Sequence, residues 1–293
     1  MVDSGQSDRP ETVKTWYSSP WLFFILVFSW SFLFWIPAGR LSQEDHSVLV
    51  TSLHYIGGLG PLLAALGLVY LGQDRKRQRD YWQRVIDFRR IRGKWYAVVF
   101  LTAPALMGIS ALIDVASGGE GIRLEAAAQL LDKPLMIIPS VIFSLFFGPV
   151  PEELGWRGYV LDRLQARWNA LSSSLILGVI WAVWHLPLFF IAGSFQYNLG
   201  FGTLSFWIFM VNIVSQALII TWIYNNTDRS TLSAILFHFT VNFTGELFEL
   251  TKAAEICQFT LSVVMALLVV VIWGPEKLRR EGKRTERNTR SYI

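Results

Sequence analysis

The chain has 293 residues, of which 53% are hydrophobic and 16% are charged, and its mean hydropathy is +0.39. An ordinary soluble domain has about 25% charged residues, so this composition excludes a soluble protein and favours one that lies in a membrane. The formal net charge is only +4, although the chain holds 26 basic residues. The single cysteine, Cys257, excludes an intramolecular disulfide and a metal site built from cysteines.

Eight apolar segments follow one another along the chain, each long enough to cross about 30 Å of hydrocarbon as a helix. They are residues 20–38, 47–72, 95–116, 135–160, 170–192, 203–225, 230–249 and 256–274. The sequence therefore predicts an all-α polytopic membrane protein with about eight transmembrane helices and one transmembrane domain, residues 16–274. Residues 1–15 are predicted to be a disordered cytoplasmic tail and residues 275–293 a basic cytoplasmic tail.

The basic residues give an independent test of this topology. If both termini are cytoplasmic, 22 of the 26 basic residues lie on the cytoplasmic side, and the other side has only Arg40, Arg123, Lys133 and Lys252. This asymmetry follows the positive-inside rule. We therefore expect a multi-pass protein of a bacterial plasma membrane whose basic loops face anionic lipids, and the runs of Lys and Arg do not indicate nucleic-acid binding.

The fourth predicted span contains three charged residues close together. A charged side chain near the centre of a bilayer costs at least roughly 2.5 to 3.5 kcal/mol, so such residues need a partner or a function. Glu153 and Arg157 are four residues apart, which lets them pair on one face of a helix. Glu152 points about 100° away around the helix and is therefore free to face another group.

The fifth and seventh predicted spans add two imidazoles and a carboxamide. His185 lies just before Pro187, which removes a backbone donor from the helix. His238 and Asn242 are four residues apart and share a helix face. Each residue taken singly has a structural interpretation, a hydrogen bond between helices, but their combination favours a functional site. Helical rise puts Glu152 and His238 about 12 Å and His185 about 20 Å from the cytoplasmic ends, so we expect one cavity open to the cytoplasm.

These residues form three ordered motifs that resemble those of a known family. The run Glu152-Glu153-Leu154-Gly155-Trp156-Arg157 resembles its E-E-x-x-x-R motif, Trp181-x-x-x-His185 its second motif, in which Phe is usual at the first position, and His238-x-x-x-Asn242 its third. Residues 135–250 are thus similar to the protease core of the CPBP (ABI) family, named for CAAX proteases and bacteriocin processing. That family includes the type II CAAX endopeptidases.

The resemblance implies an intramembrane endopeptidase that acts on a membrane-associated protein or peptide. In that family pattern Glu152, assisted by His185, would activate a water molecule for attack on the scissile carbonyl. His238 and Asn242 would hold the developing oxyanion. Glu153 and Arg157 would keep Glu152 in place. The sequence does not indicate whether the substrate is prenylated.

No cofactor is firmly implied, and several alternatives stay open. If a divalent metal such as zinc takes part, the predicted ligands are Glu152, His185 and His238, because nitrogen and oxygen ligands suit Zn²⁺. No H-E-x-x-H motif is present, so a glutamate-dependent and a metalloprotease mechanism are both possible. Two other functions also fit: a non-catalytic immunity or binding protein of the same fold, and a proton-coupled transporter, which would also place Glu and His within the bilayer.

Overall fold

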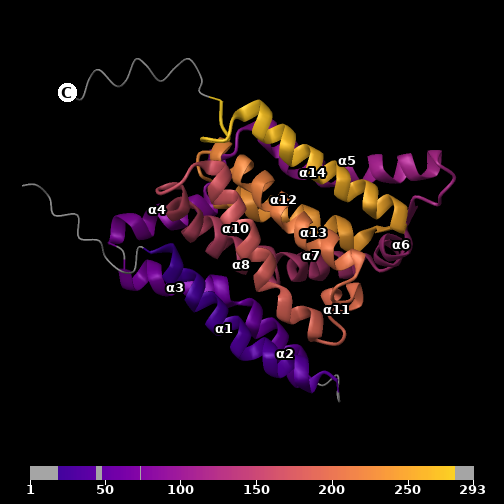
Figure 1. Cartoon of the computed structure of the whole chain (residues 1–293), viewed down its shortest axis with the longest axis horizontal. Coiled ribbons are helices and arrows are strands. Elements are labelled where there is room, and N and C mark those ends of the chain that lie inside the picture. Colours follow the sequence, from indigo (N-terminus) through magenta and orange to yellow (C-terminus); the bar gives the residue numbers. More distant parts are fainter. Residues whose placement is uncertain (1–18, 44–47, 73, 281–293) are drawn as a thin grey trace, which may run out of the picture.

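The computed structural model of the chain describes residues 19–43, 48–72 and 74–280, so the predicted tail at residues 1–15 lies outside the described residues. The described part is almost wholly helical (Figure 1). Its only two strands, β1 (Ile122–Arg123) and β2 (Glu249–Leu250), form a short antiparallel pair. The prediction of an all-α polytopic fold is confirmed.

The α-helices follow in the order α1 (Pro20–Leu41), α2 (Val48–Gly58), α3 (Gly60–Gly72), α4 (Arg75–Ile86), α5 (Gly93–Ala116), α6 (Glu125–Asp132), α7 (Ile137–Phe146), α8 (Pro149–Gly155), α9 (Leu161–Gln165), α10 (Ala170–Trp184), α11 (Phe195–Leu199), α12 (Leu204–Asn226), α13 (Thr231–Leu247) and α14 (Lys252–Trp273). Four short turns lie between them: the 3-10 turns η2 (Phe88–Arg90), η3 (Pro134–Met136) and η5 (Leu186–Phe190), and the π-helical turn η4 (Trp156–Val160). In Figure 1, α5 and α14 lie along one side, α1 to α3 along the other, and α10, α12 and α13 between them.

Fewer helices are long enough to cross a membrane than the eight segments predicted. Six stretches of the described residues are long and apolar enough, and the pair of α2 and α3, bent by 43°, makes a possible seventh. The seventh predicted span, residues 230–249, is α13, which has 17 residues and is therefore only about 25 Å long. Helix α13 packs between α12, α8 and α5. It can therefore be shorter than the hydrocarbon core of a bilayer, which is about 30 Å thick, because protein rather than lipid surrounds it.

The bend between α2 and α3 is held by side chains of α1. Trp35 Nε1 donates to the carbonyl of His54 at 2.7 Å, and Ser31 Oγ donates to the carbonyl of Gly57 at 2.7 Å. A Cβ at Gly57 would lie 2.3 Å from Trp35 Nε1, so only glycine allows this close approach. Carbonyl groups near a helix break need such partners, because no water reaches them in a bilayer.

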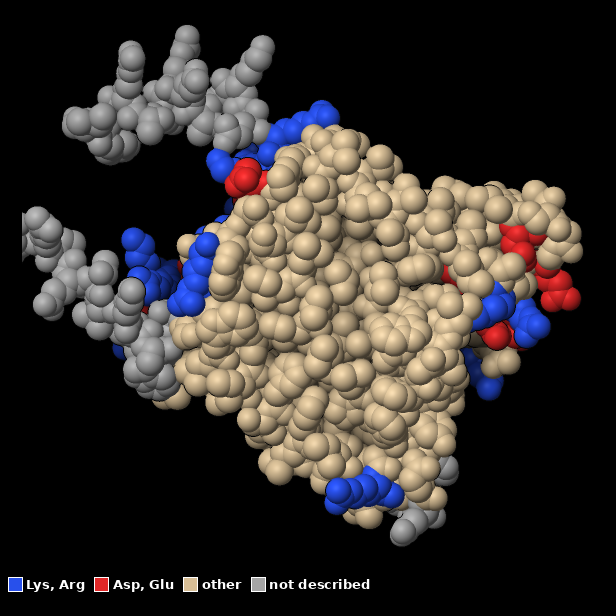
Figure 2. Space-filling view, in the orientation of Figure 1, with Lys and Arg blue, Asp and Glu red and all other residues tan. Residues whose placement is uncertain are grey.

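Because successive helices alternate in direction, the molecule has two ends. The basic end contains residues 74–92, 166–169, 227–230 and 274–280, and the distal end contains residues 117–133, 191–203 and 248–251. Hydrogen bonds connect the segments within each end. At the basic end the Ala170 amide donates to the Glu276 carbonyl, and at the distal end the Thr251 amide donates to the Gly121 carbonyl. Figure 2 shows Lys and Arg over the basic end and a smaller mixed group of acidic and basic residues near α6 at the distal end.

The chain after α14 does not leave the protein at once. Leu278 is fully buried, and Asn226 Nδ2 donates to its carbonyl at 2.7 Å. Residues 275–280 therefore pack against the ends of α10 and α12, although the sequence placed them in the basic tail. The rest of that predicted tail, residues 281–293, lies outside the described residues.

Candidate functional site

The two adjacent glutamates lie on the short helix α8, which begins in the middle of the stretch Pro134–Gln165. Phe147 and Gly148 separate α8 from α7, and Pro149 is the first residue of α8. Proline fits the first position of a helix because its missing N–H would have had no partner there. Glu152 and Glu153 therefore lie in the first turns of a new helix rather than in the middle of a continuous span.

Gly155 lets α8 pack directly against α3. A Cβ at Gly155 would lie 2.6 Å from Pro61 Cβ and 2.7 Å from the Pro61 carbonyl oxygen. These distances are far below van der Waals contact, and one of the two atoms belongs to the backbone. The glycine in the E-E-L-G-W-R run is therefore a packing requirement.

The π-helical turn η4 follows α8 directly, and helix α4 holds it from the basic end. Such turns are frequent at functional sites and leave backbone carbonyls without their usual helical partners. Tyr81 Oη donates to the carbonyl of Leu154 at 3.0 Å, and Arg84 Nη2 donates to the carbonyl of Gly158 at 3.0 Å. Burial raises the pKa of the Tyr81 hydroxyl, which keeps it a donor.

Glu153, Arg157 and His238 form one buried group. Arg157 Nη1 contacts both carboxylate oxygens of Glu153, at 2.8 and 2.9 Å, and His238 Nδ1 lies 2.9 Å from Glu153 Oε1. Glu153 and Arg157 are fully inaccessible to solvent. The predicted pairing of Glu153 with Arg157 is present, and the carboxylate also orients the imidazole of His238 on α13.

Glu152 points away from that group, as its position on the helix predicts, and is held by two indoles. Trp181 Nε1 donates to Glu152 Oε2 at 2.6 Å, and Trp156 Nε1 is 3.4 Å from the same oxygen. The sequence singled out Trp181 only as an aromatic residue where Phe is usual in the resembled family. Phe has no side-chain donor, so the hydrogen bond to Glu152 depends on the indole of Trp181. A buried indole N–H needs an acceptor, and this requirement was the sequence signal for Trp181 as a residue of the site.

His185 follows the last residue of α10, where the helix tightens into the 3-10 turn η5. The His185 backbone N–H bonds to the carbonyl of Ala182 instead of that of Trp181, so the Trp181 carbonyl is free and lies 2.8 Å from His185 Nδ1. A carbonyl only accepts hydrogen bonds, so Nδ1 must carry the hydrogen. In the neutral ring Nε2 then has the free lone pair, which can accept a proton.

Asn242 lies one turn beyond His238 on α13, and its amide lies over the break before α8. A Cβ at Gly148 would be 3.5 Å from Asn242 Nδ2. The Glu153 contact fixes the hydrogen of His238 on Nδ1, so Nε2 donates only when the ring is protonated. Asn242 can donate from its amide in any protonation state.

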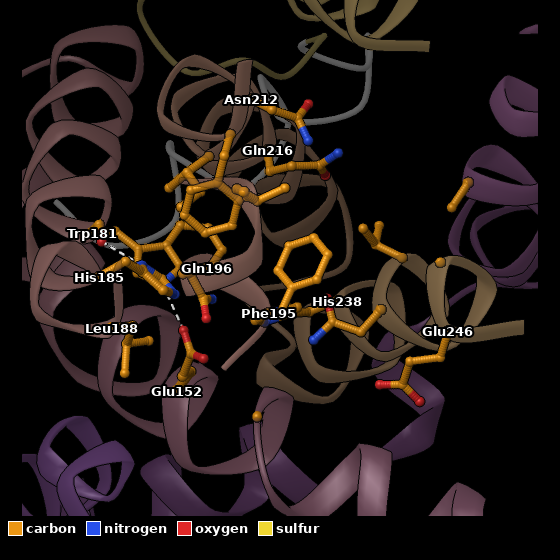
Figure 3. Close-up of a pocket in the computed structure, with 18 of the residues that line it drawn as sticks. Glu152, Trp181, His185, Leu188, Phe195, Gln196, Asn212, Gln216, His238 and Glu246 are labelled. Atoms are coloured by element: carbon orange, nitrogen blue, oxygen red, sulfur yellow. Dashed lines mark hydrogen bonds between the residues drawn. The ribbon is translucent and has the colours of Figure 1, made fainter. Parts of the chain in front are cut away.

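One cavity of about 590 Å³ joins these groups. Glu152, His185, His238 and Asn242 all line it, whereas Glu153 and Arg157 lie behind its wall. Figure 3 shows Glu152, His185 and His238 around this space, with Asn212 and Gln216 of α12 on another side. Neither amide belongs to the three motifs, but both line the cavity.

The cavity extends toward the distal end and not toward the basic end. Its lining includes residues of the segment 191–203 and of the distal halves of α12, α13 and α14. Three of the exposed residues in the lining, Phe195, Gly245 and Glu246, lie at that end. The sequence placed the opening on the side of the basic loops. That expectation was wrong, because helical rise gives a depth but not the direction in which a cavity widens.

The predicted metal ligands do not form a metal-binding group. Among residues 19–43, 48–72 and 74–280, no set of three or more His, Cys, Asp or Glu side chains is arranged to hold a metal ion. Trp181 occupies one oxygen of Glu152, and Glu153 occupies one ring nitrogen of His238. The arrangement of Glu152, His185 and His238 therefore does not fit the proposed zinc site.

Comparison with known proteins identifies the segment that carries the site. Residues 134–244 match the family model described as type II CAAX prenyl endopeptidase Rce1-like. CAAX prenyl protease 2 of Methanococcus maripaludis is 26% identical over 261 residues, which are 88% of this chain and 96% of the relative. Lysostaphin resistance protein A of Staphylococcus haemolyticus is 22% identical over 227 residues, which are 74% of this chain and 57% of that protein.

These similarities support an intramembrane endopeptidase in a multi-pass membrane protein. The matched residues contain all three motifs and the break before α8. Residues 134–244 are thus similar to the Rce1-like type II CAAX prenyl endopeptidases, and the family resemblance of the motifs is confirmed.

Proposed function

We propose that the protein hydrolyses a peptide bond of a membrane-associated protein or peptide, using a water molecule activated by Glu152 and His185. The observation that carries this proposal is the convergence of Glu152, His185, His238 and Asn242, from three separate helical stretches, on one cavity within the membrane-spanning region. A carboxylate, two imidazoles and a carboxamide are a complete set for activating water and binding an oxyanion.

Water activation needs a proton acceptor that is fixed before the substrate binds. Trp181 holds one oxygen of Glu152, and the Trp181 carbonyl fixes the His185 tautomer, so a single residue orients both groups. The proton of the attacking water passes to the Glu152 carboxylate, with His185 Nε2 as the second acceptor. The same proton then goes to the leaving amine, as general acid–base catalysis requires.

Asn242 and His238 complete the mechanism on the side of the carbonyl oxygen. A tetrahedral intermediate carries negative charge on that oxygen, and a donor placed for it contributes about 2.7 to 4 kcal/mol. The amide of Asn242 supplies one donor. His238 supplies a second donor, Nε2, when its ring is protonated, while Glu153 holds the Nδ1 side of the ring.

The partners follow from the setting of the site. The similar protein of Methanococcus maripaludis is named a CAAX prenyl protease, and we propose a membrane-associated polypeptide as the substrate class here. We also propose a bacterial plasma membrane, with the basic end in contact with anionic lipids on the cytoplasmic side. The similarity to a resistance protein favours one alternative function, a non-catalytic immunity or binding protein.

The test is cleavage of membrane-anchored peptides by the purified protein. Glu152→Ala and His185→Ala are expected to lose cleavage while retaining the thermal stability of the parent protein. His54→Ala is the matched control, because His54 lines the same cavity but belongs to none of the three motifs. Full cleavage by either motif variant would remove the assignment, and no cleavage by the parent protein would favour the binding alternative.

The metal question has its own experiment. Elemental analysis of the purified protein, combined with cleavage in the presence of a chelator, tests whether zinc is bound and required. Cleavage that continues at full rate without bound metal is the expected result, because the three candidate ligands do not form a metal-binding group. Stoichiometric zinc with loss of cleavage in chelator would contradict the glutamate-dependent mechanism.

A further inference from the structure

The catalytic cavity is closed toward the basic end. Between Glu152 and the basic end, the side chains of Trp156, Arg157 and Tyr159 are at most 1% exposed. Trp156 and Tyr159 pack against Phe23 of α1, and the guanidinium of Arg157 lies against the ring of Trp181. The cavity lining contains no residue of the segments 74–92, 166–169, 227–230 or 274–280. Within the described part of the chain, no path therefore leads from the catalytic groups to the basic end.

Toward the distal end the cavity is open, and one of its walls carries polar side chains. Along α12 the lining residues Gln216, Asn212 and Ser205 follow one another from the level of the catalytic groups to the first turn of the helix. Gln258 and Glu255 on α14 continue the same wall. Carboxamides both donate and accept, so this wall offers hydrogen bonds to an extended peptide backbone that passes along it.

The charge of the two ends fixes the orientation in the membrane. On the topology that puts both termini on one side, 22 basic residues belong to that side and 4 to the other. The basic helix α4 with its neighbouring turn lies at the same end as the chain after α14 (Figures 1 and 2). The positive-inside rule places this end in the cytoplasm, and the distal end then faces the extracytoplasmic side.

We propose that the cavity receives polypeptide segments from the extracytoplasmic face of the membrane, so that the substrates are exported peptides or the external parts of membrane-anchored proteins. Calling the bound polypeptide a substrate rests on the proposed function. The direction in which the cavity opens follows from the geometry of the cavity and the charge of the two ends alone. A segment bound along α12 reaches Glu152 from the distal end, with its carbonyl toward Asn242.

Two glycines provide a matched pair for testing the direction of opening. Gly245 lines the cavity near its distal end and Gly93 lies at the basic end; both are exposed, and a Cβ at either position would meet no atom within 4 Å. Cysteine at these positions therefore does not disturb packing. Cys257 is first replaced by Ala so that each variant, Gly245→Cys or Gly93→Cys, has one thiol.

Intact cells are treated with a membrane-impermeant maleimide before and after permeabilisation. We expect the thiol of Gly245→Cys to be labelled in intact cells and that of Gly93→Cys to be labelled only after permeabilisation. The reverse pattern, equal labelling of both thiols in intact cells, or protection of the thiol in Gly245→Cys after permeabilisation would overturn the inference. The amount of each variant in the membrane fraction shows whether it folded, and Phe195→Cys is a second variant at the same opening.

A second experiment uses the full chain reconstituted in vesicles. A membrane-anchored peptide is added outside, and the protein population with its distal end outward is identified by the same maleimide. Cleavage confined to that population supports the inference, and cleavage confined to the opposite population overturns it. Absence of cleavage in both populations removes the proposed function, while the labelling result still decides the direction of opening.

Discussion

Replacing Trp181 by Phe removes one hydrogen bond from the carboxylate of Glu152, the proposed proton acceptor, and leaves an aromatic ring in place. The indole N–H donates to Glu152 Oε2 at 2.6 Å, between two side chains that are 4% and 9% exposed. Trp181 also contacts His238 edge to face, and the guanidinium of Arg157 lies 5.0 Å from its ring centre. Phe keeps a ring face for these contacts, so the variant isolates the N–H group.

The size of the effect follows from the strength of a hydrogen bond to a charged group. Such a bond contributes about 1.5 to 3 kcal/mol in a folded protein. Each 1.36 kcal/mol of transition-state stabilisation changes the rate about tenfold, so the loss in kcat is about 10- to 150-fold. Trp156 Nε1, 3.4 Å from the same oxygen, can move closer and compensate in part. We therefore expect a loss near the lower figure.

The assay is cleavage of a membrane-anchored peptide under single-turnover conditions, with thermal unfolding measured on the same samples. Trp184→Phe is the matched control, because Trp184 lies on the same helix, is 2% exposed and donates its N–H to Ser31 instead of Glu152. The control variant Trp184→Phe loses the same atoms as Trp181→Phe and also loses one hydrogen bond. If Trp181→Phe cleaves as fast as the parent protein, or no slower than Trp184→Phe, the orienting role of the indole is refuted.

Three further predictions concern packing and charge around the site. Gly155→Ala is expected to lower the thermal unfolding temperature in detergent, because the new Cβ would lie 2.7 Å from a backbone oxygen, whereas Gly67→Ala in the facing helix α3 meets nothing within 4 Å; equal stability of the two variants would contradict this. Arg84→Ala is expected to cost about 1 to 3 kcal/mol of unfolding free energy, since it leaves the buried carbonyl of Gly158 without its donor while Arg229 still pairs with Asp162, whereas Arg77→Ala, in an exposed pair, costs about 0 to 1 kcal/mol; similar losses would show that Arg84 is dispensable. Glu246→Gln removes a carboxylate at the opening of the cavity, whose lining contains no Lys or Arg, and is expected to reduce kcat/KM for a peptide with Lys near the scissile bond more than for its neutral counterpart; an unchanged ratio would exclude a contribution of this charge.

The sequence was sufficient to predict the helical membrane fold and the residues that meet in the cavity. Spacing along a helix separates Glu152 from Glu153, and motif order predicts that His185 and His238 face them. What the sequence could not provide is the contact made by a single atom of an aromatic residue. Phe and Trp at position 181 are equivalent in hydrophobic pattern, but only Trp donates to Glu152.

The direction of the cavity was predicted wrongly for a related reason. Depth along a helix depends only on the number of residues, whereas direction depends on which side chains fill the space on either side. Trp156 and Tyr159 close one side, and their burial arises from packing against α1, where Phe23 contacts both rings. That contact joins residues more than 130 positions apart, and no local pattern indicates it.

The two adjacent glutamates have different environments, which on the proposed mechanism give them different roles. Glu153 is fully buried with Arg157 and His238, and removing one member of such a group typically costs 3 to 5 kcal/mol because it leaves a charge without a partner. Glu152, one residue earlier, accepts from two neutral indole groups and lines the cavity. A cation beside Glu152 would weaken it as a proton acceptor, because a nearby positive charge favours the ionised form. By pairing with Arg157, Glu153 places the positive charge behind the wall and at the same time orients His238. On the proposed mechanism the helix thus separates two demands, structural charge compensation and proton transfer, that one carboxylate could not meet together.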